Sequence, residues 1–288
     1  MPTRYYCSLA SQANREALYG TVARIRSWLL IEYPAVWNRD AVEGSRLLPD
    51  GVKTHLRQLE VDRTLLVRQT HTYRYPLRTF FVDSCGDQPC IRQHEFEEYE
   101  QLTQLSRGAA PADDVNGLMF LVCTHSRHDR CCAKFGMPVW CALRDSIPDR
   151  AWQCSHIGGD RFAANLVVLP YGVYYGHVTP ADVPELVRRS DAGEIWLPGF
   201  RGRSCYTRPV QVAEYFLRRE SGELEINGFR VVSVSEGEVV FEGRVDLVEH
   251  RVKFAIRSDA FRQRLTCDSK EESPVKQYEL TSYVRYRP

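Results

Sequence analysis

The sequence lacks a long hydrophobic run and an excess of charge of either sign. Its longest uncharged stretch, residues 162–176, falls short of the ~20 apolar residues of a membrane-spanning helix and is interrupted by Asn165, Pro170 and Gly172. Its 38 basic and 37 acidic residues give a net charge of +1, so no strong field attracts nucleic acid or anionic lipid. We therefore expect neither a membrane segment nor a nucleic-acid partner.

Catalytic signatures are also missing. The chain contains no Gly-x-Gly-x-x-Gly or Walker loop, no Gly-x-Ser-x-Gly and no His-Glu-x-x-His.

The N-terminus carries Arg4, Arg15 and Glu16 without the apolar segment of a secretory signal, so we expect a cytoplasmic protein. With 43% apolar and 26% charged residues, the composition is typical of a globular chain with two or three compact units.

Ten cysteines are present, and in a reducing compartment their spacing decides which of them matter. Six stand singly or in an undistinguished pair, and we expect them to be structurally inert thiols. These six are Cys7, Cys85, Cys90, Cys141, Cys205 and Cys267. The other four lie in two polar segments, residues 123–132 and 154–165.

Hydrophobic periodicity divides the first half into strands and helices. Strands are predicted at residues 28–33, 64–68 and 78–82, and helices at residues 51–59 and 94–105. In the second helix Phe96, Tyr99 and Leu102 follow one face. Residues 106–114 are typical of a linker, so we place a domain boundary near residue 110.

The second half repeats the same order of elements. A strand at residues 118–122 precedes a helix at 131–144, a strand at 150–154, and a strand pair at 166–169 and 173–177. Helices at residues 180–189 and 210–219 follow, the first with a proline at its start. The β-α-β-β-α order of each half is that of a thioredoxin-like domain. The match of Leu65–His71 with Phe120–His125 suggests an ancient duplication.

Beyond residue 222 the pattern changes to alternating apolar and polar residues, with glycines at the turns. Strands are predicted at residues 230–234, 239–241 and 252–256, and the last twenty residues are predicted to be a loosely held tail. The sequence therefore predicts an α/β fold of tandem thioredoxin-like domains, residues 1–110 and 111–222. A small β-rich extension at residues 223–288 completes the chain.

Thiols, imidazoles and a carboxylate gather after two strands of the second half. Cys123 lies where the first strand enters a loop, and Cys132 lies at the start of the following helix, whose positive end favours a thiolate. Their spacing is too wide for the Cys-x-x-Cys of a zinc knuckle, so the loop must fold back. His156 follows another strand, and the glycine pair after it allows a tight turn that presents Asp160. This pattern predicts a metal site built from two distant loops.

In these segments the sequence resembles the sucrase/ferredoxin-like family, whose bacterial and fungal members have thioredoxin-like ferredoxin domains. The matching residues are Cys123–His125, Asp129, Cys131–Ala133, Gly136, Pro138, Ser155–Gly159, Arg161–Ala163, Tyr174–Gly176, Arg201–Ser204 and Trp28–Glu32. The resemblance covers about residues 25–220. It implies a 2Fe-2S cluster held by Cys123, Cys132, His156 and a second histidine four residues later, where this chain has Asp160.

The departure at Asp160 leaves two ligand sets open. A carboxylate oxygen is harder than an imidazole nitrogen and is anionic, so Asp160 as a ligand gives a mixed Cys/His/Asp shell with a lower potential than a two-histidine shell. Alternatively Cys154 is the fourth ligand, because strand alternation places it on the same side as His156.

The resemblance implies an electron-transfer protein that exchanges single electrons with a redox protein partner, either a reductase or an acceptor. We expect such a carrier rather than a catalyst of bond chemistry. The alternative is a thiol-redox or zinc-binding thioredoxin-like protein without a cluster. No sequence pattern identifies the pair of carboxylates that glycoside hydrolysis needs.

Polar neighbours of the predicted site have more ordinary interpretations. Cys131 is expected to pack within its helix or to serve as a backup thiol. His125 and His128 are expected to be solvated, although His125 is also placed to hydrogen-bond a cluster sulfur. Three arginines are expected on a solvated face, or alternatively on a basic rim for an acidic partner; they are Arg127, Arg130 and Arg161.

Overall fold

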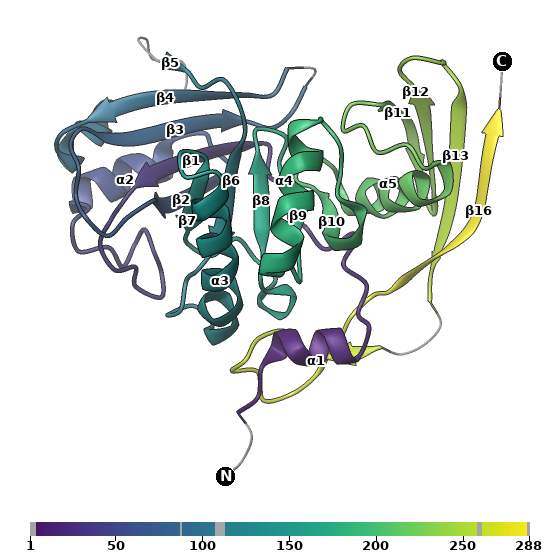
Figure 1. Cartoon of the computed structure of the whole chain (residues 1–288), viewed down its shortest axis with the longest axis horizontal. Helices are drawn as coiled ribbons and strands as arrows, with labels where there is room; N and C mark the ends of the chain where they lie inside the picture. The colour runs from purple at the N-terminus through teal and green to yellow at the C-terminus, as the bar shows by residue number, and fades with distance from the viewer. Residues whose placement is uncertain (1–3, 87, 107–112, 258–260, 287–288) are drawn as a thin grey trace.

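A ten-stranded mixed sheet forms the centre of the molecule (Figure 1). The computed structural model describes residues 4–86, 88–106, 113–257 and 261–286. The strand order is β10-β9-β8-β6-β7-β2-β1-β3-β4-β5. The strands are β1 Ser27–Glu32, β2 Arg63–Arg68, β3 Leu77–Asp83, β4 Cys90–Phe96, β5 Asp113–Asp114, β6 Met119–Cys123, β7 Ala151–Cys154, β8 Leu166–Leu169, β9 Val173–Tyr175 and β10 Phe200–Arg203.

Both halves of this sheet have the same topology. In the first half the order is β2-β1-β3-β4, with β1 parallel to β2 and antiparallel to β3. In the second half the order is β7-β6-β8-β9, with β6 parallel to β7 and antiparallel to β8. This repeat confirms the predicted α/β fold class. In this repeat β1 is equivalent to β6, and β2 is equivalent to β7. The sequence match between residues 65–71 and 120–125 compares β2 with β6, so it was wrong as an alignment.

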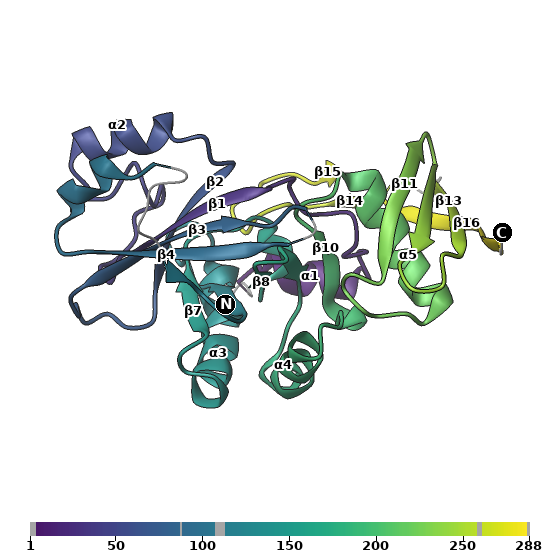
Figure 2. The same ribbon diagram turned by 90° about the horizontal axis from the view of Figure 1, so that it is seen from above.

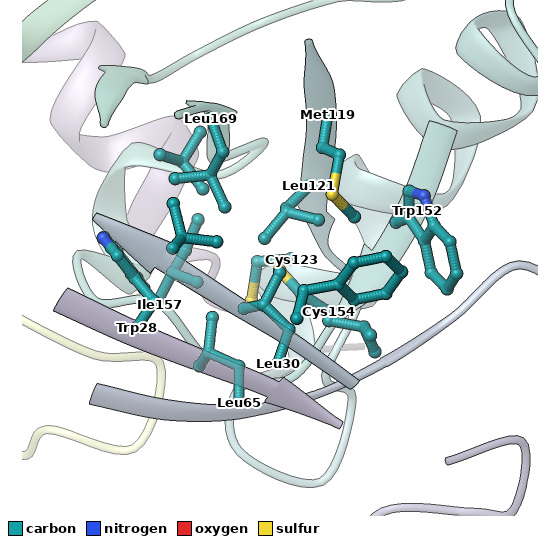
Figure 3. Close-up of a cluster of buried hydrophobic side chains, with 14 of the residues drawn as sticks. Trp28, Leu30, Leu65, Met119, Leu121, Cys123, Trp152, Cys154, Ile157 and Leu169 are labelled. Carbon is teal, nitrogen blue, oxygen red and sulfur yellow. The ribbon is translucent and has the colours of Figure 1, made fainter. Parts of the chain in front are cut away.

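The two halves meet where β2 pairs antiparallel with β7, with Val67 opposite Cys154. The sheet then curls, so that strands far apart in the sheet order face each other. Trp28 of β1 stacks on Tyr174 of β9 with ring centroids 6.2 Å apart, and Phe80 meets Trp152 edge to face at 5.4 Å. The inner face is therefore a closed apolar core shared by both halves (Figure 3).

Helices cover the outer faces of the sheet. The helical segments are α1 Cys7–Ala13, α2 Asp50–Gln58, η1 Tyr99–Gln104, α3 Arg130–Ser146, η2 Asp160–Phe162, η3 Pro180–Asp182, α4 Val183–Asp191, η4 Leu197–Gly199 and α5 Arg208–Ser221. The α2 helix and η1 pack on the first half, whereas α3 and α4 pack on the second half. Figure 2 shows α2 on the opposite side of the sheet from α3 and α4.

The C-terminal part adds a separate four-stranded antiparallel sheet in the order β11-β12-β13-β16, against which α5 packs. Its strands are β11 Phe229–Ser235, β12 Glu238–Gly243, β13 Glu249–Ile256 and β16 Tyr278–Tyr286. A small two-stranded sheet of β14 Arg262–Gln263 and β15 Ser273–Pro274 lies between β13 and β16 in the chain. The predicted β-rich extension is thus present.

Two predicted elements were wrong. Residues 94–105 do not form one helix, because residues 90–96 pair with β3 along their whole length as β4 and only residues 99–104 are helical. The last twenty residues are not a loose tail, because β16 pairs with β13 and its Tyr278, Leu280 and Tyr283 pack on the core of the extension.

Three further features qualify the sequence-based picture. The α1 helix and β10 had no predicted counterpart. Most of the predicted linker, residues 107–112, lies outside the described residues together with the boundary near residue 110, and the domain limits stay a prediction. Among the described residues, every helix is too short or too polar to cross a membrane.

Candidate metal centre

Cys123 occupies the C-terminal end of β6, beside the junction of the two halves. Met119, Leu121 and Cys123 alternate onto the inner face of the sheet, where the thiol is buried among apolar side chains (Figure 3). The start of α3 lies directly against this strand end. A Cβ atom at Gly136 would come within 2.2 Å of the Cys123 carbonyl oxygen, so the absence of a side chain at residue 136 permits the close approach.

Cys132 comes from the first turn of α3. Asp129 caps this helix, because its Oδ1 accepts a hydrogen bond from the Cys131 backbone N–H at 2.7 Å. The cap fixes the direction of the first helical turn, and it turns the fully buried Cys132 thiol toward the end of β6. The loop after Cys123 therefore folds back, as the sequence predicts.

His156 and Asp160 are presented by the tight turn after β7. Gly158 and Gly159 have φ values of +93° and +82°, a region that favours glycine. The buried Arg201 side chain donates to the Gly158 carbonyl at 3.2 Å and to Asn165 Oδ1 at 2.7 Å. Asn165 in turn donates to the Gly159 carbonyl. The turn is therefore held in place by buried polar contacts from other strands.

The four predicted ligand residues converge in the structure. His156 Nδ1 lies 3.9 Å from Cys123 Sγ and 3.8 Å from Cys132 Sγ. Asp160 Oδ1 lies 3.3 Å from Cys132 Sγ and 3.3 Å from His156 Nδ1. The sulfurs and the His156 nitrogen all lie within 4.8 Å of one another, a spacing that a metal ion can bridge.

Electrostatics distinguish the two thiols. The hydrogen bond from Cys132 holds the pKa of Cys123 well below its usual range, and His156 and the His125 backbone N–H add to this effect against the cost of burial. The pKa of Cys132 is raised, first by its bond to Cys123 and then by burial. The thiolate is thus favoured at Cys123, whereas the sequence placed this preference on Cys132.

The pKa values of the His156 imidazole and the Asp160 carboxyl are also changed by their surroundings. Burial disfavours the charged imidazole, but Cys123 and Asp160 more than offset it and raise the pKa of His156. Burial likewise raises the pKa of Asp160, which His156 only partly offsets. Both groups therefore have protonation states that depend on what occupies the space between them.

Cys154, the alternative fourth ligand, lies beside Cys123 on the neighbouring strand. The two residues are register partners in the parallel pairing of β6 and β7, and both belong to the same apolar core (Figure 3). Burial raises the pKa of the Cys154 thiol well above its usual range. Within the part of the chain that the structure describes, Cys154 is absent from the groups of converging ligand atoms.

The two loop histidines differ from the expected solvated residues. His125 is buried and its Nε2 is 2.7 Å from the Asn38 carbonyl oxygen, while its backbone rather than its side chain reaches Cys123. His128 stacks on His156 with ring centroids 3.6 Å apart, and its Nε2 is 3.9 Å from Asp160 Oδ2. His128 is thus a further candidate ligand that spacing alone did not identify, because it reaches the site only through the folded loop.

An open hollow of about 510 Å³ gives access to the imidazole side of the centre. It is lined by Arg39, Asp40, Ala41, Val42, Arg63, Thr64, Leu65, His125, His128, Ser155 and His156. The His156 side chain is 17% exposed, whereas both sulfurs are buried. The first half of the chain therefore supplies much of the wall through which a partner reaches His156.

The three arginines expected on a solvated face differ in their surroundings. Arg161 is largely buried and pairs with Glu16 at 2.6 Å, and Arg130 pairs with Asp268. Arg127 donates to Asn38 Oδ1 at 2.6 Å. Arg127 is nevertheless exposed and Arg130 is half-buried, so the expected solvated face is wrong for Arg161 alone, and the basic rim stays a prediction.

Comparison with known proteins gives a family match and a weak likeness to two solved structures. A family model described as sucrase/ferredoxin-like matches residues 18–202, a segment that contains every predicted ligand. A thioredoxin-like [2Fe-2S] ferredoxin from Aquifex aeolicus is 22% identical, with a TM-score of 0.27 over 30% of this chain and 91% of that chain. A cysteine-to-serine variant of the ferredoxin from this organism is 23% identical, with a TM-score of 0.26 over 29% and 97% of the two chains. No curated protein matches the chain significantly.

Proposed function

Because the chain belongs to the sucrase/ferredoxin-like family, we propose that it is a one-electron carrier with a 2Fe-2S cluster held by Cys123, Cys132, His156 and Asp160. The observation that carries the proposal is the convergence of two buried sulfurs on one imidazole nitrogen, at 3.9 and 3.8 Å. When bound, such a cluster supplies a site that accepts and donates single electrons.

The donor atoms suit this cofactor. Thiolate sulfur and imidazole nitrogen are the protein ligands of mixed-ligand 2Fe-2S centres. Cys123 is favoured as a thiolate, the form that binds iron. Asp160 adds an anionic oxygen 3.3 Å from the Cys132 sulfur. The chemistry of the four groups therefore fits an iron–sulfur centre with one oxygen ligand.

The surrounding residues exclude water and define the route for electrons. The sulfurs lie in the apolar core that both halves share, whereas His156 faces the hollow. We place the docking site of the redox partner, a reductase or an acceptor, over this hollow, with His156 as the nearest ligand. Arg39 and Arg63 line the hollow, so an acidic partner surface would be attracted to it.

A second candidate is a single zinc ion at Cys123, Cys132 and His156. The ligand atoms of these three residues lie within 4.8 Å of one another, a spacing expected around one tetrahedral ion, and Asp160 lies 3.3 Å from two of them. A zinc protein or a dithiol protein is colourless, whereas a 2Fe-2S protein is reddish-brown and bleaches on reduction.

The test is the Cys123→Ser variant of the full chain, purified without oxygen and assayed for iron, acid-labile sulfide and visible absorption. We expect the wild type to contain two irons and two sulfides per chain, as a 2Fe-2S cluster requires. The variant should lose at least about nine tenths of both, because a serine oxygen is a poor ligand for this centre.

Cys90→Ser is the matched control, because Cys90 is a half-buried strand residue remote from the site in the sheet order. It should retain the colour. Full retention of iron and sulfide in Cys123→Ser would remove Cys123 from the ligand set. A colourless wild type with one zinc in place of iron would favour the second candidate.

A further inference from the structure

Three thiols from distant parts of the chain form a second cluster, which we call the Cys7–Cys131–Cys267 cluster. Cys7 comes from α1, Cys131 from the first turn of α3, and Cys267 from the segment between β14 and β15. The sulfur–sulfur distances are 3.7 Å for Cys7–Cys131, 3.2 Å for Cys131–Cys267 and 3.6 Å for Cys7–Cys267. All three residues are buried. The sulfurs thus form a closed triangle that the sequence did not indicate.

A carboxylate joins the triangle. Asp129 is only 4% exposed, and its two oxygens accept hydrogen bonds of 2.7 Å from the backbone N–H groups of Cys131 and Cys267. One oxygen lies within 4.8 Å of all three sulfurs. A carboxylate has about four lone-pair sites, so these bonds leave it able to bind a further group. A buried carboxylate is costly unless it is paired with a positive charge or coordinates a metal. Its position beside three thiols therefore points to a bound cation.

The spacing fits one tetrahedral ion. Zinc–sulfur bonds of about 2.3 Å place two sulfurs of a tetrahedral site roughly 3.8 Å apart, close to two of the three distances here. A disulfide requires a sulfur–sulfur bond of about 2.05 Å, which is shorter than all three distances here. It would also join only two of the three thiols. All ten cysteines are free in the structure. Sulfur ligands select soft or borderline ions.

We propose that Cys7, Cys131, Cys267 and Asp129 bind one zinc ion, distinct from the centre at Cys123 and Cys132. Four buried protein ligands make this a closed, structural type of site. Although Cys131 and Cys132 are adjacent, consecutive residues of a helix point about 100° apart, and their sulfurs belong to different groups of converging ligands. The ion would fasten α1 and the C-terminal segment to the start of α3.

Figure 1 shows where the segments that carry the cluster lie. The α1 helix lies at the bottom of the view, and the yellow C-terminal chain loops beside it before it rises to β16 at the edge of the four-stranded sheet. The Arg130–Asp268 pair joins the start of α3 to the C-terminal segment, and the Arg161–Glu16 pair joins η2 to the residues that follow α1. Zinc at this cluster therefore closes the chain around the helix that carries Cys132.

The experiment measures zinc and iron together in the full chain, purified without oxygen, for the wild type and for Cys7→Ser, Cys267→Ser and Cys123→Ser. We expect one zinc per wild-type chain in addition to iron. Cys7→Ser and Cys267→Ser should lose zinc at least tenfold and keep their iron, sulfide and visible spectrum. Cys123→Ser should keep its zinc whatever happens to iron, so failure of this site and failure of the proposed electron carrier are distinguishable. Cys90→Ser should keep both metals.

X-ray absorption at the zinc edge of the wild type provides a test that does not depend on a variant folding. We expect three sulfur ligands at about 2.3 Å and one oxygen at about 2.0–2.2 Å. Unchanged zinc in both Cys7→Ser and Cys267→Ser would overturn the proposal. So would zinc that disappears only with Cys123→Ser, or a disulfide among the three thiols in zinc-free protein purified without oxygen.

Discussion

Asp160 brings a buried carboxyl group to the candidate centre. It is 5% exposed, and its Oδ1 lies 3.3 Å from both His156 Nδ1 and Cys132 Sγ. Burial raises its pKa, so the free carboxyl is held in a place where its negative charge is poorly solvated. A bound cation would remove this cost. An anionic ligand also disfavours the addition of an electron, so a cluster with Asp160 as a ligand would be harder to reduce than one with imidazole at this position.

The substitution Asp160→His should therefore raise the reduction potential. Two-histidine 2Fe-2S centres have potentials of about −150 to +300 mV, against about −400 mV for four-cysteine centres. We expect an increase on the order of 100 mV or more, and a new pH dependence from the added imidazole. A redox titration followed by visible absorption or electron paramagnetic resonance, repeated at several pH values, measures both.

Cys154→Ser and His128→Gln are the matched controls for this prediction. Neither should change the potential of the wild type by a comparable amount if Asp160 is the fourth ligand. An unaltered potential in Asp160→His, together with loss of colour in Cys154→Ser or in His128→Gln, would assign the fourth position to the thiol or to the stacked imidazole.

At the scale of secondary-structure elements, the α1 helix packs against a half-buried histidine. His177 follows β9, and its ring lies 3.2–3.5 Å from Ser8, Ser11 and Gln12 of α1. Burial lowers the pKa of His177 to about 4, from 6.5. The imidazole is therefore neutral where α1 packs on it.

This shift predicts loss of stability in mild acid. Between about pH 6.5 and pH 4 the unfolded chain binds a proton at His177 that the folded chain does not, so the free energy of unfolding falls as the pH decreases through this range. The loss is about 2 kcal/mol at about pH 5. Urea unfolding at about pH 7.5 and about pH 5 should show a larger decrease for the wild type than for His177→Asn. Equal decreases in the two proteins would show that His177 does not control the acid response.

Elements with strong local patterns were predictable, and elements that depend on distant partners were not. The uninterrupted apolar run Trp28–Ile31 predicted β1 from sequence, and all four residues are buried in the structure. Residues 90–96 include Arg92, Gln93, His94 and Glu95, which do not alternate as in an ordinary strand, and pairing with β3 decides their structure. Likewise β16 is defined by its partner β13 rather than by its own residues.

The same distinction applies to the metal-binding residues. Cys123 and Cys132, and His156 and Asp160, are close in sequence and follow strand ends, so their convergence could be predicted. Cys7 and Cys267 are 124 and 136 residues from Cys131 and have no neighbouring ligand residue in the sequence apart from Asp268. Only the folded chain brings them together, which is why the sequence assigned them as inert thiols.

At the scale of the whole molecule, the first half acts as a scaffold for the centre in the second. Ser155, which precedes His156, donates its backbone N–H to the Leu66 carbonyl at 2.8 Å, and its hydroxyl accepts from the Leu66 N–H. The Asn38 carbonyl holds the His125 ring on the other side of the loop. Contacts from β2 and from the segment after β1 thus fix both loops of the site, even though the first half contributes none of the ligands proposed for the cluster at Cys123 and Cys132.

The segments around Cys7 and Cys267 meet at the Cys7–Cys131–Cys267 cluster, so removal of a metal bound there should loosen both segments at once. Metal-binding free energy is coupled to the ordering of the segments that supply the ligands. A chelator that removes zinc while the visible absorption stays constant should therefore speed tryptic cleavage after the exposed residues Arg15 and Lys270. We expect at least a tenfold increase, because cleavage requires local opening of these segments. Cys7→Ser should be cleaved at the fast rate without chelator, and chelator should add nothing further. Equal rates for wild type with and without zinc would show that the ends are held by packing and by pairs such as Arg161–Glu16, and not by the metal.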